Sequence, residues 1–456
     1  MTVYTAVTDT DRTAMLDAIG VADVAELFDA IPPELRLGRA LELPAGMSEQ
    51  DVYAHLRELA ARNVSADDEL TFLGGGMYDH YVPAIVDMLM SRSEFLTPYT
   101  PYQPEVSQGN LQVMFEYQTA ISELTGLPVS NASVYEGPSA LASAAYLAKL
   151  ANGRRRHVVS AGVHPHARET LRTYAHGFGA ELVEVPLRDG VTDPDAWQGA
   201  IDADTSAVYF QNPNFYGAVE DAEQLAQAAA AHQPVVVGSY DPIALGVLKP
   251  PGACGVDVCV GEGQPLGNRL DFGGPSFGFF AATDEHLRRM PGRIAGETLD
   301  ADGKRGFVLT LQTREQHIRR ERATSNICTS QALNALGGLV HLVWLGRQGL
   351  VDLCELLVAR THYARETLCA LDGVEPLHAQ PVVREFALRL PGVDVEAVVE
   401  RCALEGVNPG LALPQERALL VALTEQRSRA DIDRLADVLG RAVAAERVGR
   451  AQEVVA

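Results

Sequence analysis

A glycine-rich loop that follows an apolar segment carries the residue types that could do chemistry. The segment reads VDVCVGEGQPLGNRLDFGGPSFGFF from Val256 to Phe280, and predicts a strand that ends in a loop from Gly261 to Gly274. The side-chain nitrogens of this loop belong to Gln264, Asn268 and Arg269, and the loop has no lysine. The loop therefore has no amine that could form a Schiff base with an aldehyde.

The missing lysine matters because the whole chain has only three, Lys149, Lys249 and Lys304. Enzymes of the aminotransferase type hold pyridoxal 5'-phosphate (PLP) through a lysine in such a loop. Lys149 is expected in the middle of a helix, Lys249 in the turn LKPPG and Lys304 in the loop DADGKRG. The sequence predicts a PLP-enzyme fold without its own cofactor lysine, which indicates work with a partner subunit.

Two further features have the residue types of a cofactor site. Gly137-Pro138-Ser139 is expected at a helix start, where free N–H groups and the helix dipole could bind an anion. A plain helix start is the alternative. Asp241 ends the predicted strand VVVGSY, where a PLP fold places the carboxylate that pairs with the pyridine nitrogen. A capping or turn aspartate fits that position equally well.

A loop rich in proline and tyrosine, TPYTPYQPEVSQG, runs from residue 97 to 109. Its prolines forbid a regular helix and restrict the backbone, so the loop is predicted to be pre-ordered. It would then present Tyr99, Tyr102, Gln103 and Glu105, which we interpret as candidates that face a partner's active site. A loop that only covers the chain's own sheet is the alternative.

The charged stretch TREQHIRRERATSNICT, residues 313–329, allows two interpretations. One is a solvated charged helix. The other is an interface network in which its arginines form forked pairs with carboxylates of another chain.

The elements expected around these residues alternate strands and helices. Between residues 116 and 325, Val-rich strands such as RHVVSA, SAVYFQ and PVVVGSY alternate with helices such as ALASAAYLAKLANG. This order predicts an α/β fold with a doubly wound, mainly parallel sheet. Residues 1–115 are predicted to form an N-terminal helical and extended arm, and residues 326–456 a small C-terminal α/β domain.

Composition excludes several classes of function. The formal net charge of −23 opposes binding to nucleic acid, which needs clustered lysine and arginine. No apolar run reaches about 18 residues, so no membrane span is expected. The N-terminal residues have the pattern of neither a signal peptide nor a transit peptide, and we expect a cytoplasmic protein.

The cysteines and histidines do not predict a metal site. The chain has six cysteines and no CxxC pair, which favours free thiols in a reducing compartment. His164 and His166 are the closest approach to a ligand pair, and they are expected to be a helix cap and a surface residue.

Several longer blocks carry a family resemblance. They are FLGGGMYDHYVPAIVDMLMSRSEFLTPYTPYQPEVSQGNLQ (residues 72–112), NASVYEGPSAL, QNPNFYG, LKPPGACGVDVCVGEGQPLG, MPGRIAGET and GFVLTLQTREQHIRRERATSNICTSQALNAL. Together they resemble the N-terminal half of glycine dehydrogenase (decarboxylating), the P-protein of the glycine cleavage system. In the two-subunit form of this family, the matching half is subunit 1, the alpha subunit.

The resemblance implies a PLP-dependent aminotransferase-like fold (fold type I) with the cofactor lysine on subunit 2, and Gln264 near the matching position here. It implies an α2β2 assembly that decarboxylates glycine, releases CO2 and passes the aminomethyl group to the lipoyl arm of the H-protein. This chain alone is then expected to be inactive, and to bind neither PLP nor a metal.

Two alternatives remain open at this point. A self-contained PLP enzyme would need one of the three lysines as its anchor. A purely structural scaffold subunit would contribute no residue to any active site.

Overall fold

The computed structural model describes residues 6–455, which divide into two compact units, residues 1–64 and 65–456. The first unit contains α1 (Asp9–Ile19) and α2 (Glu49–Ala60). Ser48 is the N-cap of α2, because its side chain accepts a hydrogen bond from the Asp51 N–H. None of the side chains described between residues 6 and 64 is buried. The first unit therefore has no apolar core of its own.

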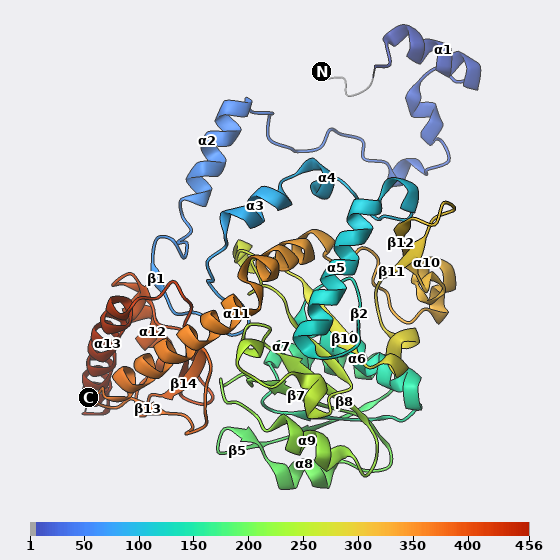
Figure 1. The fold of residues 1–456 in the computed structure, drawn as a ribbon. Coiled ribbons are helices and arrows are strands. Elements are labelled where there is room, and N and C mark those ends of the chain that lie inside the picture. Colours follow the sequence, from blue (N-terminus) through green and yellow to red (C-terminus); the bar gives the residue numbers. More distant parts are fainter. Residues whose placement is uncertain (1–5, 456) are drawn as a thin grey trace. The chain divides into compact units, whose positions relative to one another are not determined.

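A seven-stranded sheet organises the second unit, in the order β2–β10–β9–β8–β7–β3–β4 (Figure 1). Only β10 runs against its neighbours, and the pairs from β9 to β4 are parallel. The predicted doubly wound, mainly parallel sheet is confirmed. The strands are β2 (Val129–Ser130), β3 (Arg156–Ser160), β4 (Glu181–Val185), β7 (Thr205–Asn212), β8 (Val235–Tyr240), β9 (Val258–Glu262) and β10 (Gly278–Ala282).

Both faces of this sheet are covered because successive strand residues point to opposite sides. Val208 and Val236 pack into one core, while the next residues along the chain, Tyr209 and Val237, pack into another. Helices α5 (Gln108–Thr125), α8 (Pro194–Ala200) and α9 (Ala222–Ala229) contribute to the first core. Helices α6 (Gly137–Asn152) and α7 (Pro165–Gly177) contribute to the second. Each fully buried large apolar side chain stabilises the fold by about 1.5–3 kcal/mol.

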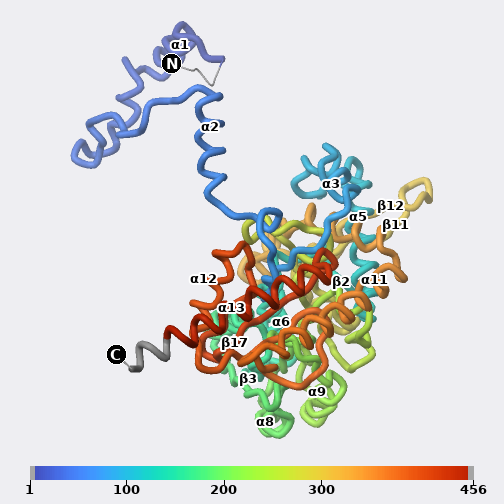
Figure 2. Tube along the Cα trace, turned by 90° about the vertical axis from the view of Figure 1, so that its left-hand side faces the viewer, coloured from blue at the N-terminus to red at the C-terminus, as the bar shows by residue number. Residues whose placement is uncertain are grey.

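The C-terminal part is built on an antiparallel sheet of order β13–β14–β17–β16. Its strands are β13 (Glu375–Pro376), β14 (Glu385–Arg389), β16 (Leu411–Leu413) and β17 (Ala418–Ala422). Helices α12 (Val395–Ala403) and α13 (Arg429–Val455) lie side by side near β17 (Figure 2). Phe72 enters this core because β1 (Leu70–Thr71) pairs in parallel with β15 (Val407–Asn408).

One long helix, α11 (Ala332–Cys369), contributes to both cores. The backbone breaks helical geometry at Gly346, with φ 62 and ψ 179, and then resumes. It resumes because Leu350, Cys354 and Leu357 place buried side chains on one helical face. The three-part division at residues 115 and 325 stays a prediction.

The segments before and after the large sheet are shorter. Helices α3 (Ala84–Met90) and α4 (Ser93–Leu96) precede the loop at residues 97–109. The hairpin of β11 (Ile294–Leu299) and β12 (Arg305–Thr310) precedes the short helix α10 (Gln316–Arg319). Helix α5 ends at Gly126, whose backbone is left-handed with φ 67.

Candidate functional site

A cavity of about 370 Å³ lies at the carboxyl ends of β7, β8 and β9, where ligands bind in open α/β sheets. Its wall includes Gln211, Asp241 and Glu262 from the ends of these strands. The start of α6 and Arg384, one residue before β14, also line it. In a PLP fold, the residues that hold the cofactor would be expected at this place.

The start of α6 is occupied by carboxylates of the chain itself. The Gly137 N–H donates to Glu262 Oε2 at 2.9 Å, and the Ser139 N–H donates to Glu136 Oε2 at 2.9 Å. Glu136 is therefore the N-cap, and Glu262 supplies a second anion to the same helix end. The interpretation of Gly137-Pro138-Ser139 as an open anion site is wrong, because acceptors within the chain use its N–H groups.

Asp241 is bound on both carboxylate oxygens. Oδ1 accepts the Ile243 N–H at 3.0 Å, as in a turn, and Oδ2 accepts from Arg384 Nε at 2.5 Å. The guanidinium carbon of Arg384 also lies 3.4 Å from the centre of the Tyr78 ring. These contacts support the turn alternative for Asp241 and leave its carboxylate ion-paired within the chain.

Gln264 is fully buried and uses its whole amide. Its Oε1 accepts the Tyr78 N–H at 2.9 Å, while its Nε2 donates to the carbonyl oxygens of Tyr78 at 3.0 Å and Asn268 at 2.9 Å. A lysine ammonium could not accept the Tyr78 N–H, so the amide serves a structural purpose that an amine could not. The residues of this cavity do not fit PLP: the helix N–H groups, Asp241 and Gln264, the residue expected near the lysine position, are all engaged within the chain.

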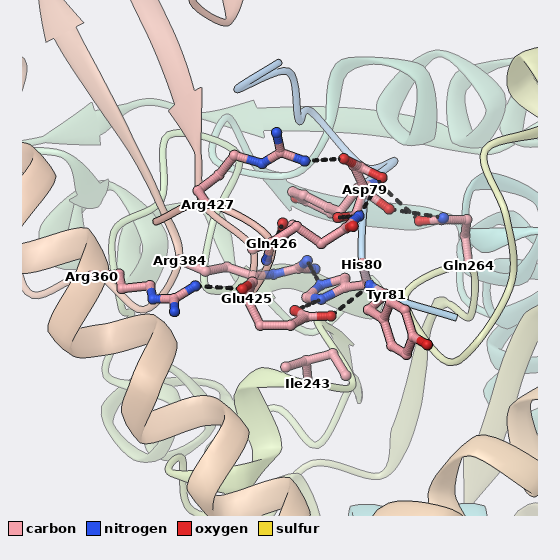
Figure 3. A network of polar contacts seen from close by, with 12 residues as sticks. Asp79, His80, Tyr81, Ile243, Gln264, Arg360, Arg384, Glu425, Gln426 and Arg427 are labelled. Atoms are coloured by element: carbon pink, nitrogen blue, oxygen red, sulfur yellow. Dashed lines mark hydrogen bonds and ion pairs between the residues drawn. The ribbon is translucent and has the colours of Figure 1, made fainter. Parts of the chain in front are cut away.

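The segment after Tyr78 is held to the C-terminal part by a polar network (Figure 3). His80 Nδ1 donates to Glu425 Oε2 at 2.6 Å, and its Nε2 accepts from Arg384 Nη1 at 2.6 Å. Asp79 forms an ion pair with Arg427. Burial alone would raise the pKa of Glu425, but the hydrogen bonds that it accepts from the His80 ring and from the Tyr81 N–H outweigh burial and lower that pKa to about 2.

The loop at residues 97–109 lies outside the cavity described above. Its four candidate side chains, Tyr99, Tyr102, Gln103 and Glu105, are all exposed, with Tyr99 76% exposed and Tyr102 41% exposed. The structure anchors the loop through Gln108, whose amide exchanges two hydrogen bonds of 2.8 Å with the Phe307 backbone in β12. That these side chains reach a partner's active site stays a prediction.

The base of this loop rests on buried charged residues. Arg293, 2% exposed, donates from Nη2 to the Tyr102 hydroxyl at 3.1 Å, and its Nε lies 3.6 Å from Glu315 Oε2. The Tyr102 ring meets His317 edge-on at 5.2 Å. The charged stretch 313–329 therefore mixes two kinds of residue. Arg314 and Glu315 are buried, whereas Arg319, Arg320 and Arg322 remain exposed.

The histidine prediction is confirmed. His164 caps α7 by accepting the His166 N–H on Nδ1 at 3.1 Å, its Nε2 donates to the Gly75 carbonyl at 2.7 Å, and His166 is exposed. No group of three or more potential metal ligands comes together among residues 6–455. No helix in that range is long and apolar enough to cross a membrane.

Comparisons with known proteins agree on one family. A family model described as glycine cleavage system P-protein matches residues 2–439. A probable glycine dehydrogenase (decarboxylating) subunit 1 from Geotalea uraniireducens is 50% identical over 438 residues, 95% of this chain and 98% of that protein. This chain belongs to the glycine cleavage system P-protein family.

Other members support the assignment. The protein of the same name from Carboxydothermus hydrogenoformans is 48% identical over 440 residues, 96% of this chain and 99% of that protein. A crystal structure of glycine decarboxylase (P-protein) in inhibitor-bound form is 44% identical, with TM-score 0.89 over 97% of this chain and 100% of that chain. A sphingosine-1-phosphate lyase from Burkholderia pseudomallei, 17% identical with TM-score 0.65, shares the fold. The predicted P-protein resemblance and PLP-dependent fold type I are confirmed.

Three charged residues of the cavity wall in this P-protein family member were not predicted from the sequence. Glu262, Arg384 and Glu385 are charged residues of the cavity wall, yet each looks like an ordinary residue at the border of a strand. For Glu262 a signal existed, because it stands in the same glycine-rich loop as Gln264. For Arg384 and Glu385 none existed, because their partners are far away in the sequence: Arg384 and Asp241 are 143 positions apart, and Glu385 and Tyr78 are 307 apart.

Stability should depend on pH through Glu385. Burial raises its pKa from 4.5 to about 7, although Gly75 N–H and the Tyr78 hydroxyl donate to it. The folded state therefore holds the proton more tightly than the unfolded state. The free energy of unfolding should fall as pH rises from about 4.5 to about 7, by up to about 3 kcal/mol.

The variant Glu385→Gln cannot titrate, so that fall should be absent from it. Urea unfolding of both proteins at several pH values between 5 and 8 measures the difference in slope. Parallel pH profiles would contradict a raised pKa at Glu385.

Proposed function

We propose that this chain is subunit 1 of a two-subunit glycine-decarboxylating P-protein. The observation that carries the proposal is the match of nearly the whole chain to the P-protein family and to proteins named subunit 1, in a chain whose loop has Gln264 instead of a lysine. The assembly decarboxylates glycine, releases CO2 and transfers the aminomethyl group to the lipoyl disulfide of the H-protein, which is reduced at one sulfur. It acts as a cytoplasmic α2β2 heterotetramer.

In this arrangement PLP is held by the partner subunit, where it withdraws the electrons left by decarboxylation. This chain supplies one wall of the partner's site. Tyr99, Tyr102, Gln103 and Glu105 are exposed on an anchored loop, which supports their contact with another chain. Their hydroxyl, amide and carboxylate groups would orient glycine and limit the access of water to the reacting centre.

Reconstitution tests the function. We expect this chain mixed with subunit 2 and lipoylated H-protein to exchange the glycine carboxyl group with labelled bicarbonate, and either subunit alone to be inactive. Exchange by subunit 2 without this chain would favour the alternative that this chain is a purely structural scaffold subunit. Exchange by this chain alone would favour a self-contained PLP enzyme.

The isolated chain should form no covalent PLP adduct after borohydride reduction. None of its lysines lines the cavity, and Lys149 instead donates to the Phe178 carbonyl at 3.3 Å. Peptide mapping of the reduced protein measures the phosphopyridoxyl content of each lysine, with subunit 2 treated in parallel as the positive control. A stoichiometric adduct on Lys149, Lys249 or Lys304 would contradict the proposed division of labour.

Deletion of residues 1–64 should weaken binding to subunit 2 without unfolding the remainder. This unit has no buried side chain in its described part and exposes Ile19, Leu35 and Leu43 among others, which suits burial against the partner. We expect the dissociation constant to rise at least about tenfold, equivalent to about 1.4 kcal/mol. Titration calorimetry with subunit 2 measures it, and the melting temperature of the truncated chain is the control. Unchanged affinity would contradict an interface role.

A further inference from the structure

We propose that Glu262 is an internal anion which takes the place of a ligand phosphate at the start of α6 and keeps this cleft closed to phosphate compounds. This role belongs to this chain alone and does not require the proposed reaction. The phosphate of PLP needs free N–H groups at a helix start, and the N–H groups at the start of α6 are already used by carboxylates of the chain.

The geometry places the Glu262 carboxylate directly on the helix end. Oε2 accepts the Gly137 N–H at 2.9 Å, and Oε1 accepts the Gln264 N–H at 3.1 Å. A Cβ at Gly137 would lie 3.1 Å from the Glu262 backbone nitrogen, so glycine permits this close approach. The carboxylate thus joins the end of β9 to the start of α6, as a bound anion would.

Three hydrogen bonds favour the ionised form of Glu262 that this role needs, against the effect of burial. Burial raises the pKa of Glu262, while a hydrogen bond from the Ser276 side chain and the N–H groups of Gly137 and Gln264 act in the opposite direction. Glu136 adds a second carboxylate through its bond to the Ser139 N–H. A phosphate dianion would have to displace Glu262 and approach Glu136, and both steps are unfavourable.

The closed state has a consequence for stability. Most folds with an anion site at a helix start gain stability when the anion binds. Here the chain supplies its own negative charge to the helix dipole, so α6 is satisfied without a ligand. Removal of Glu262 should both destabilise the chain and open a site for phosphate.

The experiment uses the full chain and inorganic phosphate as the probe. Melting temperatures of wild type and Glu262→Ala are measured in rising phosphate and in chloride at matched ionic strength. We expect wild type to respond equally to both salts. Glu262→Ala should melt at a lower temperature and regain stability in phosphate only, with a phosphate affinity at least about tenfold above that of wild type.

Glu220→Ala is the matched control. Glu220 is buried, has, like Glu262, a pKa raised by burial, and accepts the Thr192 N–H, but it is not part of the cavity wall. Its loss should destabilise the chain without any specific response to phosphate.

A second variant keeps the test decisive if Glu262→Ala does not fold. Glu262→Gln retains an acceptor oxygen for the Gly137 N–H and removes only the charge. It should also gain phosphate affinity over wild type. Equal responses to phosphate and chloride in the folded variants would overturn the proposal. The reconstituted wild-type complex is assayed separately for glycine exchange. Absence of exchange there would count against the proposed function and not against the role of Glu262.

Discussion

Replacement of Arg384 by methionine should lower the free energy of unfolding by about 3–5 kcal/mol, because it leaves the partly buried Asp241 carboxylate without its counter-charge. Arg384 is 2% exposed and donates to Asp241 and His80. Its guanidinium also stacks on the Tyr78 ring. One substitution therefore removes an ion pair, a hydrogen bond and a cation–π contact.

The measurement is equilibrium urea unfolding of the isolated chain, checked for a single transition. Arg429→Met is the matched control, since Arg429 also lies over a tyrosine ring, that of Tyr363 at 4.8 Å, but is exposed. It should leave the unfolding midpoint nearly unchanged. Arg384→Lys should recover part of the loss, because it restores the charge without the planar fork. A stability for Arg384→Met equal to that of wild type would refute a structural role for the Arg384–Asp241 ion pair.

The elements of the large sheet were predictable because their signal is local. Runs such as RHVVSA and PVVVGSY are apolar on both faces, and the structure buries successive residues Val158 and Val159 on opposite sides. The end of the helix ALASAAYLAKLANG, marked by Gly153, was visible for the same reason. Local composition decides local backbone conformation, and βα alternation then restricts the topology.

The charged wall of the cavity was not predictable in the same way. Arg384 meets Asp241 across 143 positions, and Glu262 meets Gly137 across 125. Periodicity carries no information about such pairs, which form only after both sheets are assembled. Interpreting Gly137-Pro138-Ser139 as an anion site failed for this reason: the helix start was identified correctly, but its partner lay elsewhere in the chain.

The absence of a lysine from the loop was fully predictable, because it is a property of the sequence itself. Gln264 stands in the loop after β9. Its amide forms two hydrogen bonds with the Tyr78 backbone and one with the Asn268 carbonyl oxygen. The sequence indicated that no Schiff base could form there. It did not indicate that the amide would hold the segment that leads to His80.

The loop at residues 97–109 gives the second large effect. Replacing Tyr102 by phenylalanine should lower glycine–bicarbonate exchange of the assembled complex about ten- to a hundredfold, since one lost hydrogen bond costs roughly 1–3 kcal/mol. Tyr99→Phe should act in the same direction. Arg293 donates to the Tyr102 hydroxyl at 3.1 Å, so this oxygen has a fixed position before any partner binds.

A hydroxyl aimed at the reacting centre stabilises the transition state more than bound glycine, so the turnover number should fall while the Michaelis constant changes little. Tyr174→Phe is the matched control, because Tyr174 is 41% exposed, as is Tyr102, but lies on α7. Size-exclusion chromatography establishes that each variant assembles with subunit 2. If Tyr99→Phe and Tyr102→Phe both assemble and keep full exchange activity, the loop contributes no hydroxyl to catalysis, and its prolines serve only to cover β12.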